Sequence, residues 1–412
     1  MQKILLIGFL WPEPNATAAG GRMLQLIQFF KQQKYQITFA STSTENEHTD
    51  NLSKLGINTQ SIVLNDASFD EFIWNLLPNI VLFDRFMIEE QFGWRVAKHV
   101  PNAIRILDTE DLHSLRATRQ EAHKESISFS IEDWKKNTIT KREIASIYRC
   151  DLSLIISSFE MELLTKELKV DNQLLFHLPF MLPQIEMIET EKWKSFENRK
   201  NFICIGNGKH APNLDAINWL KKEIWPRIHK QLPKSELHIY GAYLPESVQQ
   251  MHKPKEGFYI MGRAEVAIDV LEEVRVNLAP LRFGAGIKGK LVDGMHSGTP
   301  SITTTIGAEG MHGNLPWNGM ITDKAEHFAN VAVELYLNKE KWNKMQQNGV
   351  SINNKYYEKN TLHKAFLDKI NALKRDISNH RLQNFIGTML LHHSLASTKY
   401  MSRWIEEKNK SK

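Results

Sequence analysis

Short apolar segments alternate with amphipathic segments along this chain, and each half of the sequence shows this alternating pattern. The apolar residues are mostly contiguous, which is typical of strands buried on both faces of a parallel sheet. Parallel strands need helical crossovers between them. The sequence therefore predicts an α/β fold with two Rossmann-like domains in tandem, facing each other across a cleft. The expected strands are 4–8, 37–41, 79–84, 103–107 and 152–157, and then 202–206, 237–241, 258–261, 276–280 and 301–305.

A charged stretch without a predicted strand separates the two halves, and 412 residues suit two domains of this size. Residues 113–149 contain few turn-forming residues and predict helix. Asn213 is the expected N-cap of the helix that follows strand 202–206. The predicted division is an N-terminal domain over 1–183, a linker over 184–200, a second domain over 201–360, and a helical extension over 361–412.

The net charge of +5 comes from one end of the chain. Residues 361–412 contain ten Lys and Arg against four Asp and Glu, and the rest contains 42 against 43. This distribution gives no support for a nucleic-acid-binding domain, whose basic residues should line a folded face. Cys150 and Cys204 cannot form a disulfide framework and suit a reducing compartment. No apolar run approaches the roughly 20 residues that a membrane-spanning helix needs.

A glycine-rich turn between strand 276–280 and a helix at about 287–297 carries the strongest chemical signal. Gly284 and Gly286 allow the backbone to approach a ligand closely, and the free N–H groups of a helix start favour anionic oxygens. Arg282, Lys288 and Lys290 add positive charge at the carboxyl end of the strand, where ligands of open parallel sheets bind. These features predict a diphosphate site. The alternative is an ordinary tight turn with solvated lysines, in which Lys290 and Asp293 form a helix-surface pair.

The same segment resembles the donor-binding motif of GT-B glycosyltransferases, in particular retaining enzymes of the family-4 or group-1 type. Residues 205–228, 238–242 and 260–263 resemble the preceding parts of the donor domain in that family. The motif residues in this chain are Pro280, Arg282, Gly284, Gly286, Lys288, Lys290, Asp293, Gly298, Pro300 and Gly307-Ala308-Glu309-Gly310.

The resemblance implies roles for individual residues in donor binding. The family has a pair of glutamates that holds the sugar and the ribose; the second falls on Asp293 and the first on Ala285, which cannot form such a bond. Glu309 is therefore a candidate for sugar recognition. Lys288 and Lys290, with Arg282 behind them, would neutralise the departing diphosphate. The remaining donor-binding candidates are Gly20 or Gly21 near the phosphates, and Gly206, Gly241 and Arg263 along the nucleotide, with Lys209 as a weaker match.

The first domain contains two further candidate segments. Residues 107–119 resemble the Asp-x-x-Asp-x-His stretch of related bacterial enzymes, which has an arginine further on. His113 with Asp111 beside it can serve as a general base or orient a hydroxyl. The alternative is a helix start where Asp caps the amides and His faces solvent. Residues 156–160 resemble the Ser-x-x-Glu turn of the family, for which helix capping is a sufficient explanation.

The implied function is transfer of a sugar from a nucleotide-sugar donor to a saccharide or lipid-linked acceptor, with retention, in cell-surface polysaccharide or glycoconjugate synthesis. Lys290, His113 and Asp111 are the expected catalytic residues. The resemblance implies a cytoplasmic enzyme in which the first domain binds the acceptor, without metal or cofactor. Two alternatives stay open: a nucleotide-sugar epimerase of the GT-B type, and a catalytically degenerate GT-B protein that acts as a binding or scaffold subunit. A dinucleotide-dependent oxidoreductase is disfavoured, because neither half has Gly-x-Gly-x-x-Gly directly after its first strand.

The basic end of the chain supports two further hypotheses. Residues 361–374 resemble the helix that in GT-B proteins crosses back to the N-terminal domain. The residues after it mix large apolar side chains with Lys and Arg. They are expected either to form a helical extension packed on the first domain or to contact the anionic inner face of a membrane.

Overall fold

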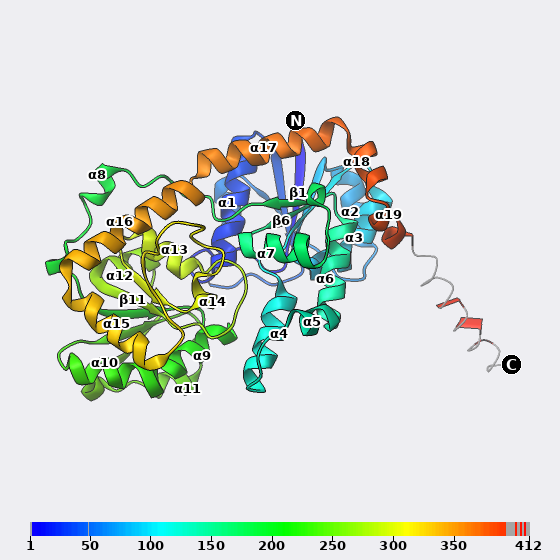
Figure 1. Ribbon diagram of the computed structural model, residues 1–412. Helices are drawn as coiled ribbons and strands as arrows, with labels where there is room; N and C mark the ends of the chain where they lie inside the picture. The colour runs from blue at the N-terminus through cyan, green and yellow to red at the C-terminus, as the bar shows by residue number, and fades with distance from the viewer. Residues whose placement is uncertain (1, 48, 393–399, 402–403, 406–407, 409–412) are drawn as a thin grey trace.

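The computed structural model describes residues 2–47, 49–392, 400–401, 404–405 and 408 and contains two parallel sheets (Figure 1). The first has seven strands in the order β3-β2-β1-β4-β5-β6-β7, and every adjacent pair is parallel. Its strands are β1 (Lys3–Gly8), β2 (Gln36–Ser41), β3 (Asn58–Ser61), β4 (Ile80–Asp84), β5 (Ile104–Asp108), β6 (Leu152–Ile155) and β7 (Leu175–His177). Its helices are α1 (Ala18–Gln32), α2 (Ser68–Leu76), α3 (Phe86–His99), α4 (His113–Lys124), α5 (Ile131–Lys136), α6 (Thr138–Arg149) and α7 (Ser158–Glu162).

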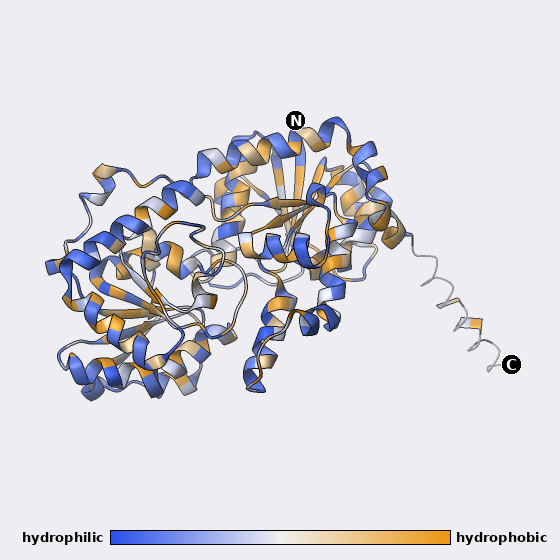
Figure 2. Cartoon of the chain, in the orientation of Figure 1, coloured by the Kyte–Doolittle hydropathy of each residue, from blue (hydrophilic) through white to orange (hydrophobic). Residues whose placement is uncertain are grey.

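Both faces of the first sheet are buried, because successive side chains of a strand point to opposite faces. Ile4 and Leu6 of β1 belong to one apolar cluster, which α1 covers. Leu5 and Ile7 belong to a second cluster on the other face, which includes residues of α2 and α3. Figure 2 shows the same concentration of hydrophobic residues along the strands of both sheets.

The second sheet has six strands in the order β10-β9-β8-β11-β12-β13, again with parallel neighbours. Its strands are β8 (Lys200–Ile205), β9 (Leu237–Tyr240), β10 (Phe258–Gly262), β11 (Val274–Ala279), β12 (Ser301–Thr303) and β13 (Gly319–Ile321). Its helices are α9 (Ala211–Trp219), α10 (Trp225–Gln231), α11 (Glu246–Gln249), α12 (Ala267–Glu273), α13 (Gly289–His296), α14 (Thr305–Ala308), α15 (Ala325–Leu337) and α16 (Lys339–Tyr356). Along the chain, α8 (Met187–Thr190) follows the last strand of the first sheet and precedes β8.

The chain returns to the first domain after α16. Helix α17 (Lys359–Arg375) runs along the N-terminal domain beside α1, as Figure 1 shows, and its Phe366, Ile370 and Leu373 complete the apolar cluster on that face. Two short helices follow, α18 (Ile377–Gln383) and α19 (Phe385–Leu391). The side-chain amide of Asn384 donates to the carbonyl of Tyr148 at 2.7 Å, which fixes α19 beside α6.

The α/β prediction is confirmed, and each expected strand is present with ends within two residues of the prediction. The prediction missed β3, β7 and β13, which are short and stand at or next to the edges of their sheets. The expected helix over 113–149 is interrupted and forms α4, α5 and α6. Asn213 does not cap α9, because the N-cap is His210 and Asn213 lies in the first turn. Among the described residues, no helix is both long and apolar enough to cross a membrane.

Candidate active site

The glycine-rich turn after β11 lies against the first domain. Gly286 has φ 64°, a left-handed conformation that favours glycine, and a Cβ there would lie 2.7 Å from Cβ of Asp111. A Cβ on Gly289, the first residue of α13, would lie 2.8 Å from Cβ of Ala18 at the start of α1. The turn therefore needs glycine at 286 both for its backbone conformation and for its close approach to the first domain.

Two side chains of the first domain hold this turn on either side of Ala285. Arg119 donates to the carbonyl of Gly284 at 2.9 Å and forms a bidentate pair with Glu309 at 2.8 and 2.9 Å. The carboxyl of Glu160 accepts from the amide of Gly286 at 2.8 Å. Ala285 itself packs against the apolar cluster of the first domain. The conformation of the turn thus depends on both domains.

The two predicted phosphate-binding lysines lie at the start of α13. Lys288 Nζ donates to the carbonyl of Gly286 at 2.8 Å, and Lys290 Nζ donates to Asn213 Oδ1 at 2.7 Å. Burial lowers the pKa of Lys288 to about 8 and also lowers the pKa of Lys290. Burial raises the pKa of Asp293 to about 7, against the effect of Lys290. An anion placed here would favour the charged form of both lysines.

Arg282 has a partner within its own domain. Its guanidinium forms two hydrogen bonds with Asp215, at 2.8 and 2.6 Å, and lies 5.1 Å from the ring centre of Trp219. His123 Nε2 of the first domain approaches the same carboxylate to 3.4 Å. The role of Arg282 toward a diphosphate stays a prediction.

His113 and Asp111 lie at the carboxyl end of β5, where α4 begins. His113 Nε2 is 3.6 Å from Asp111 Oδ1, and the histidine side chain is only 14% exposed. The solvent-facing alternative is therefore wrong. The alternative that Asp111 caps α4 is also wrong, because Glu143 of α6 accepts from the amides of His113 and Ser114 at 2.8 and 3.2 Å.

The charges of this pair follow from their surroundings. Burial lowers the pKa of His113 to about 4, so the imidazole is neutral near pH 7. Burial opposes ionisation of Asp111, but its pair with Arg116, together with His113 and His210, outweighs this and lowers its pKa to about 2. The arrangement can therefore supply a neutral histidine with a carboxylate beside it.

The sequence analysis missed a buried polar cluster at the ends of β4 and β5. Arg85 and Glu110 have φ of 75° and 63°, which is uncommon for residues other than glycine and recurs at functional sites. Asp84 Oδ1, Arg85 Nε and Glu110 Oε1 are buried without a hydrogen-bond partner in the described part of the chain. Burial, with Asp108 and Asp84 nearby, raises the pKa of Glu110 to about 8. Asp84 ends β4, Arg85 follows it directly, and Glu110 lies two residues after the end of β5; this position at strand ends is the signal that could have identified them.

Arg22 anchors this cluster from α1. Its guanidinium is fully buried and forms hydrogen bonds of 2.8 to 3.1 Å with Asp108. It also donates to the carbonyl of Leu178 at 2.7 Å. Arg22 thus fixes Asp108 at the end of β5, next to the cluster.

The predicted glycine loop before α1 lies beside the second domain. Thr17 caps α1 by accepting from the amide of Gly20, whose position leaves no room for a Cβ against the backbone of Glu13. At Gly21, by contrast, no atom of the described residues lies within 4 Å of an added Cβ. Asn207 donates to the carbonyl of Ala16 at 3.1 Å across the domain boundary.

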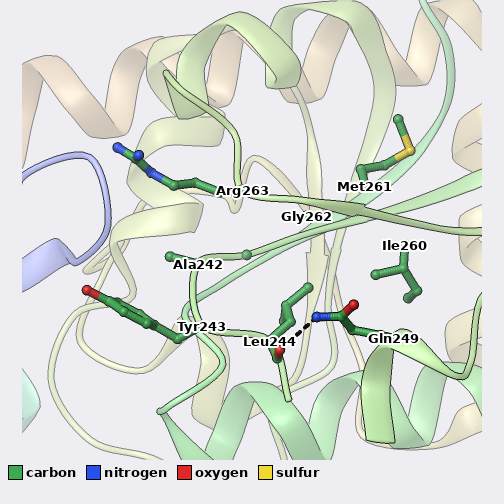
Figure 3. A pocket seen from close by; sticks show the side chains of 9 residues that line it. Ala242, Tyr243, Leu244, Gln249, Ile260, Met261, Gly262 and Arg263 are labelled. Carbon is green, nitrogen blue, oxygen red and sulfur yellow. Dashed lines mark hydrogen bonds between the residues drawn. The ribbon is translucent and has the colours of Figure 1, made fainter. Parts of the chain in front are cut away.

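A cavity of about 430 Å³ opens at the ends of β9 and β10 (Figure 3). Gly241 and Arg263, both predicted to line a nucleotide, contribute to its wall. The Tyr243 hydroxyl donates to Glu13 at 3.1 Å, which links the cavity to the loop before α1. Gly206 lies nearby in the fold, and a Cβ on it would meet Lys290 Nζ at 2.6 Å. The structure thus brings the lysines, the cavity and the glycine loop of α1 to one boundary between the domains.

Comparisons with known proteins agree with this arrangement. Residues 199–338 match the family model described as "Glycosyl transferases group 1". A glycosyltransferase from Rickettsia africae is 12% identical, with a TM-score of 0.65 over 92% of this chain and 99% of that one. Sucrose-phosphate synthase from Thermosynechococcus elongatus is 13% identical, with a TM-score of 0.69 over 90% and 99%. HepE from Anabaena, solved with UDP-glucose, is 11% identical, with a TM-score of 0.64 over 90% and 100%.

No curated protein sequence matches the chain. The fold is nevertheless the GT-B fold, and residues 199–338 supply its group 1 glycosyltransferase domain. Both the family match of residues 199–338 and the fold agree with the resemblance of the glycine-rich segment. No group of three or more His, Cys, Asp or Glu in the described residues is arranged to hold a metal ion.

Proposed function

We propose that this protein transfers a sugar from a nucleotide-sugar donor to a saccharide or lipid-linked acceptor, with retention, in cell-surface polysaccharide or glycoconjugate synthesis. It would do so in the cytoplasm, without a metal or cofactor. The observation that carries the proposal is the placement of Lys288 and Lys290 at the start of α13, directly beside the glycine turn. Amides and two buried cations at one point form a site for a diphosphate.

The cavity at the ends of β9 and β10 is the proposed nucleoside site. Arg263 is the one charged residue among the nine described residues that line it. The Anabaena protein of the same fold was solved with UDP-glucose. We therefore use uridine nucleotides as the first probes.

In the proposed reaction, the bond between the anomeric carbon and the diphosphate oxygen breaks, and the acceptor oxygen forms the new bond to that carbon. The acceptor loses its hydroxyl proton to the departing phosphate on the same face, which retains the configuration. Lys290 would stabilise the charge that develops on the diphosphate. Neutral His113 would orient a hydroxyl of the reacting sugars, with Asp111 holding the imidazole.

The buried cluster of Asp84, Arg85 and Glu110 is the proposed acceptor site. Glu110 Oε1 and the ion pair of Asp84 Oδ1 with Arg85 Nε, at 3.5 Å, form no hydrogen bond within the described chain and can bond to the hydroxyl groups of a saccharide. This assigns the acceptor to the first domain and the nucleoside diphosphate of the donor to the second.

Peripheral membrane contact would involve the end of the chain. Phe385 of α19 is 66% exposed. Other exposed apolar residues near it in sequence are Leu382, Ile386, Met389, Tyr400, Met401, Trp404 and Ile405. Residues 393–399, part of the same predicted tail, lie outside the described residues. Apolar residues with Lys and Arg among them favour an anionic lipid surface, and co-sedimentation of Phe385→Ser with anionic and neutral vesicles tests this contact.

A screen of nucleotides and nucleotide sugars by thermal shift tests the main proposal, because a ligand of the native state raises its melting temperature. Incubation of a binding nucleotide sugar with and without saccharide acceptors then separates the possible functions. Transfer requires an acceptor, whereas an epimerase forms an isomer from the nucleotide sugar alone. Binding without either product would indicate a scaffold, and no shift with any nucleotide would contradict the proposal.

A further inference from the structure

Glu160 of α7 reaches from the first domain to the glycine turn of the second. Its side chain is almost completely buried, with the residue 1% exposed. Oε1 accepts two hydrogen bonds, from the amide of Gly286 at 2.8 Å and from the amide of Leu112 at 3.1 Å. Two amides from different domains therefore fix the position and the plane of this carboxyl group.

The second oxygen of Glu160 has unused hydrogen-bonding capacity. Oε2 is buried and has no hydrogen-bond partner among the described residues. A buried polar atom without a partner is unfavourable, and such atoms in native proteins call for an explanation. Burial, with the charge of Asp111, raises the pKa of Glu160 to about 8. Near neutral pH the group is mostly protonated, so it can donate as well as accept.

The position of Oε2 relates it to the donor. The amide that holds Oε1 belongs to the same turn whose neighbours, Lys288 and Lys290, form the proposed diphosphate site. A sugar attached to a diphosphate in that site would be only a few bonds from the turn. Ala285, in the middle of the turn, has no polar side-chain atom and packs against the apolar cluster of the first domain. A hydroxyl of the sugar must therefore find its partner on another residue.

We propose that Glu160 is a specificity-determining residue of the donor-sugar subsite. Its Oε1 is fixed by two amides, and its Oε2 forms a hydrogen bond with one hydroxyl of the transferred sugar. The subsite is complete only when the two domains are together, because the carboxyl belongs to one and the turn to the other. This inference rests on the proposed function.

Calorimetry with a series of donor analogues tests the assignment. The probes are UDP, UDP-glucose and UDP-glucose analogues that each lack one hydroxyl of the glucose. In the wild type, the analogue without the relevant hydroxyl should bind about 3- to 10-fold more weakly than UDP-glucose, the effect of one hydrogen bond. In Glu160→Ala this ratio should fall to about one, while the ratios for the other analogues stay unchanged. Each ratio compares two affinities of the same variant. A general loss of affinity caused by a displaced turn therefore cancels in it.

Two further variants make the result decisive. Glu160→Gln keeps an oxygen that can accept from both amides and replaces Oε2 by an NH₂ group, so it should fold and change the ratio for the same analogue only. Glu162→Gln, on the exposed side of the same helix, should leave every ratio unchanged. Identical ratios in wild type, Glu160→Ala and Glu160→Gln would overturn the proposal and reduce Glu160 to a support of the turn.

The experiment distinguishes failure of the proposed function from failure of the inference about Glu160. If UDP and UDP-glucose do not bind the wild type, the same series is made with GDP and GDP-mannose. Failure of both nucleotides to bind would contradict the nucleotide-sugar site itself, and the inference with it. Binding of the nucleotide with no effect of Glu160 contradicts the inference alone.

Discussion

The two sides of the proposed site satisfy their polar groups in different ways. On the side of the second domain, Lys288, Lys290 and Arg282 each have a hydrogen-bond partner within that domain. On the side of the first domain, Glu110 leaves an oxygen without a hydrogen bond in the described chain, and Asp84 Oδ1 forms none either, although Arg85 Nε lies 3.5 Å from it. Under the proposed function, the donor side is preformed for an anion, whereas the acceptor side completes its hydrogen bonds only with its ligand.

Loss of a cation from the preformed side should have the largest effect. We expect Lys290→Ala to lower the transfer rate by about 10²-fold, because a group that stabilises developing charge contributes roughly 3 kcal/mol to the transition state. Its affinity for a nucleoside diphosphate should fall at least several-fold. Calorimetry and initial rates measure the two effects. The exposed Lys222→Ala is the matched control, and unchanged affinity in Lys290→Ala would remove the proposed site.

A carboxylate at position 285 should impair the enzyme although it restores the residue that the GT-B resemblance leads one to expect. The half-buried Ala285 side chain packs on the apolar cluster of the first domain, and a carboxylate there would lose part of its hydration against that cluster. We expect Ala285→Glu to lower activity about 10-fold, since it would hold the domains apart. Ala285→Ser, which is small, should change activity less. A gain of activity in Ala285→Glu would show that the turn does not need this contact.

A change on the acceptor side should affect the acceptor alone. Glu110→Gln alters one of the atoms without a described partner, so we expect the KM for the acceptor to rise about 3- to 10-fold. The dissociation constant of the donor nucleotide should stay the same. Steady-state kinetics at fixed donor concentration measures the first quantity, with the exposed Glu121→Gln as control. An equal change in donor affinity would break the division between the two sides.

The smallest expected effect is on stability as a function of pH. The pKa of Glu110 is raised from 4.5 to about 8, so the native state binds more protons than the unfolded chain between these values. The free energy of unfolding therefore falls as pH rises across this range. His113 has the opposite sign below its ordinary pKa of 6.5, so the fall should be clearest above about pH 7.

Urea unfolding at about pH 7 and pH 8 checks this prediction, with an expected loss of up to about 1 kcal/mol from Glu110. In Glu110→Gln the loss should be smaller. An equal slope in the variant would mean that Glu110 is ionised in the native state at neutral pH.

The long apolar strands and the glycine turn could be predicted because their signals are local. Strand β3, with the sequence Asn-Thr-Gln-Ser, has no apolar pattern, since it lies exposed at a sheet edge. The bidentate pair of Arg119 and Glu309 joins residues 190 positions apart, and no spacing rule indicates it. The same holds for Glu160, whose partner Gly286 is 126 positions away. Local patterns thus indicated the residues proposed for the donor side, and tertiary packing determined the rest of the proposed site.

The placement of α17 has a consequence for how this protein is made. The Phe366 ring lies 4.7 Å from that of Phe29 and 5.6 Å from that of Phe176, at the centre of the first domain's core. During synthesis from the N-terminus, the first domain therefore cannot complete this core until the whole second domain has left the ribosome. The two domains must mature together, although each has a sheet of its own.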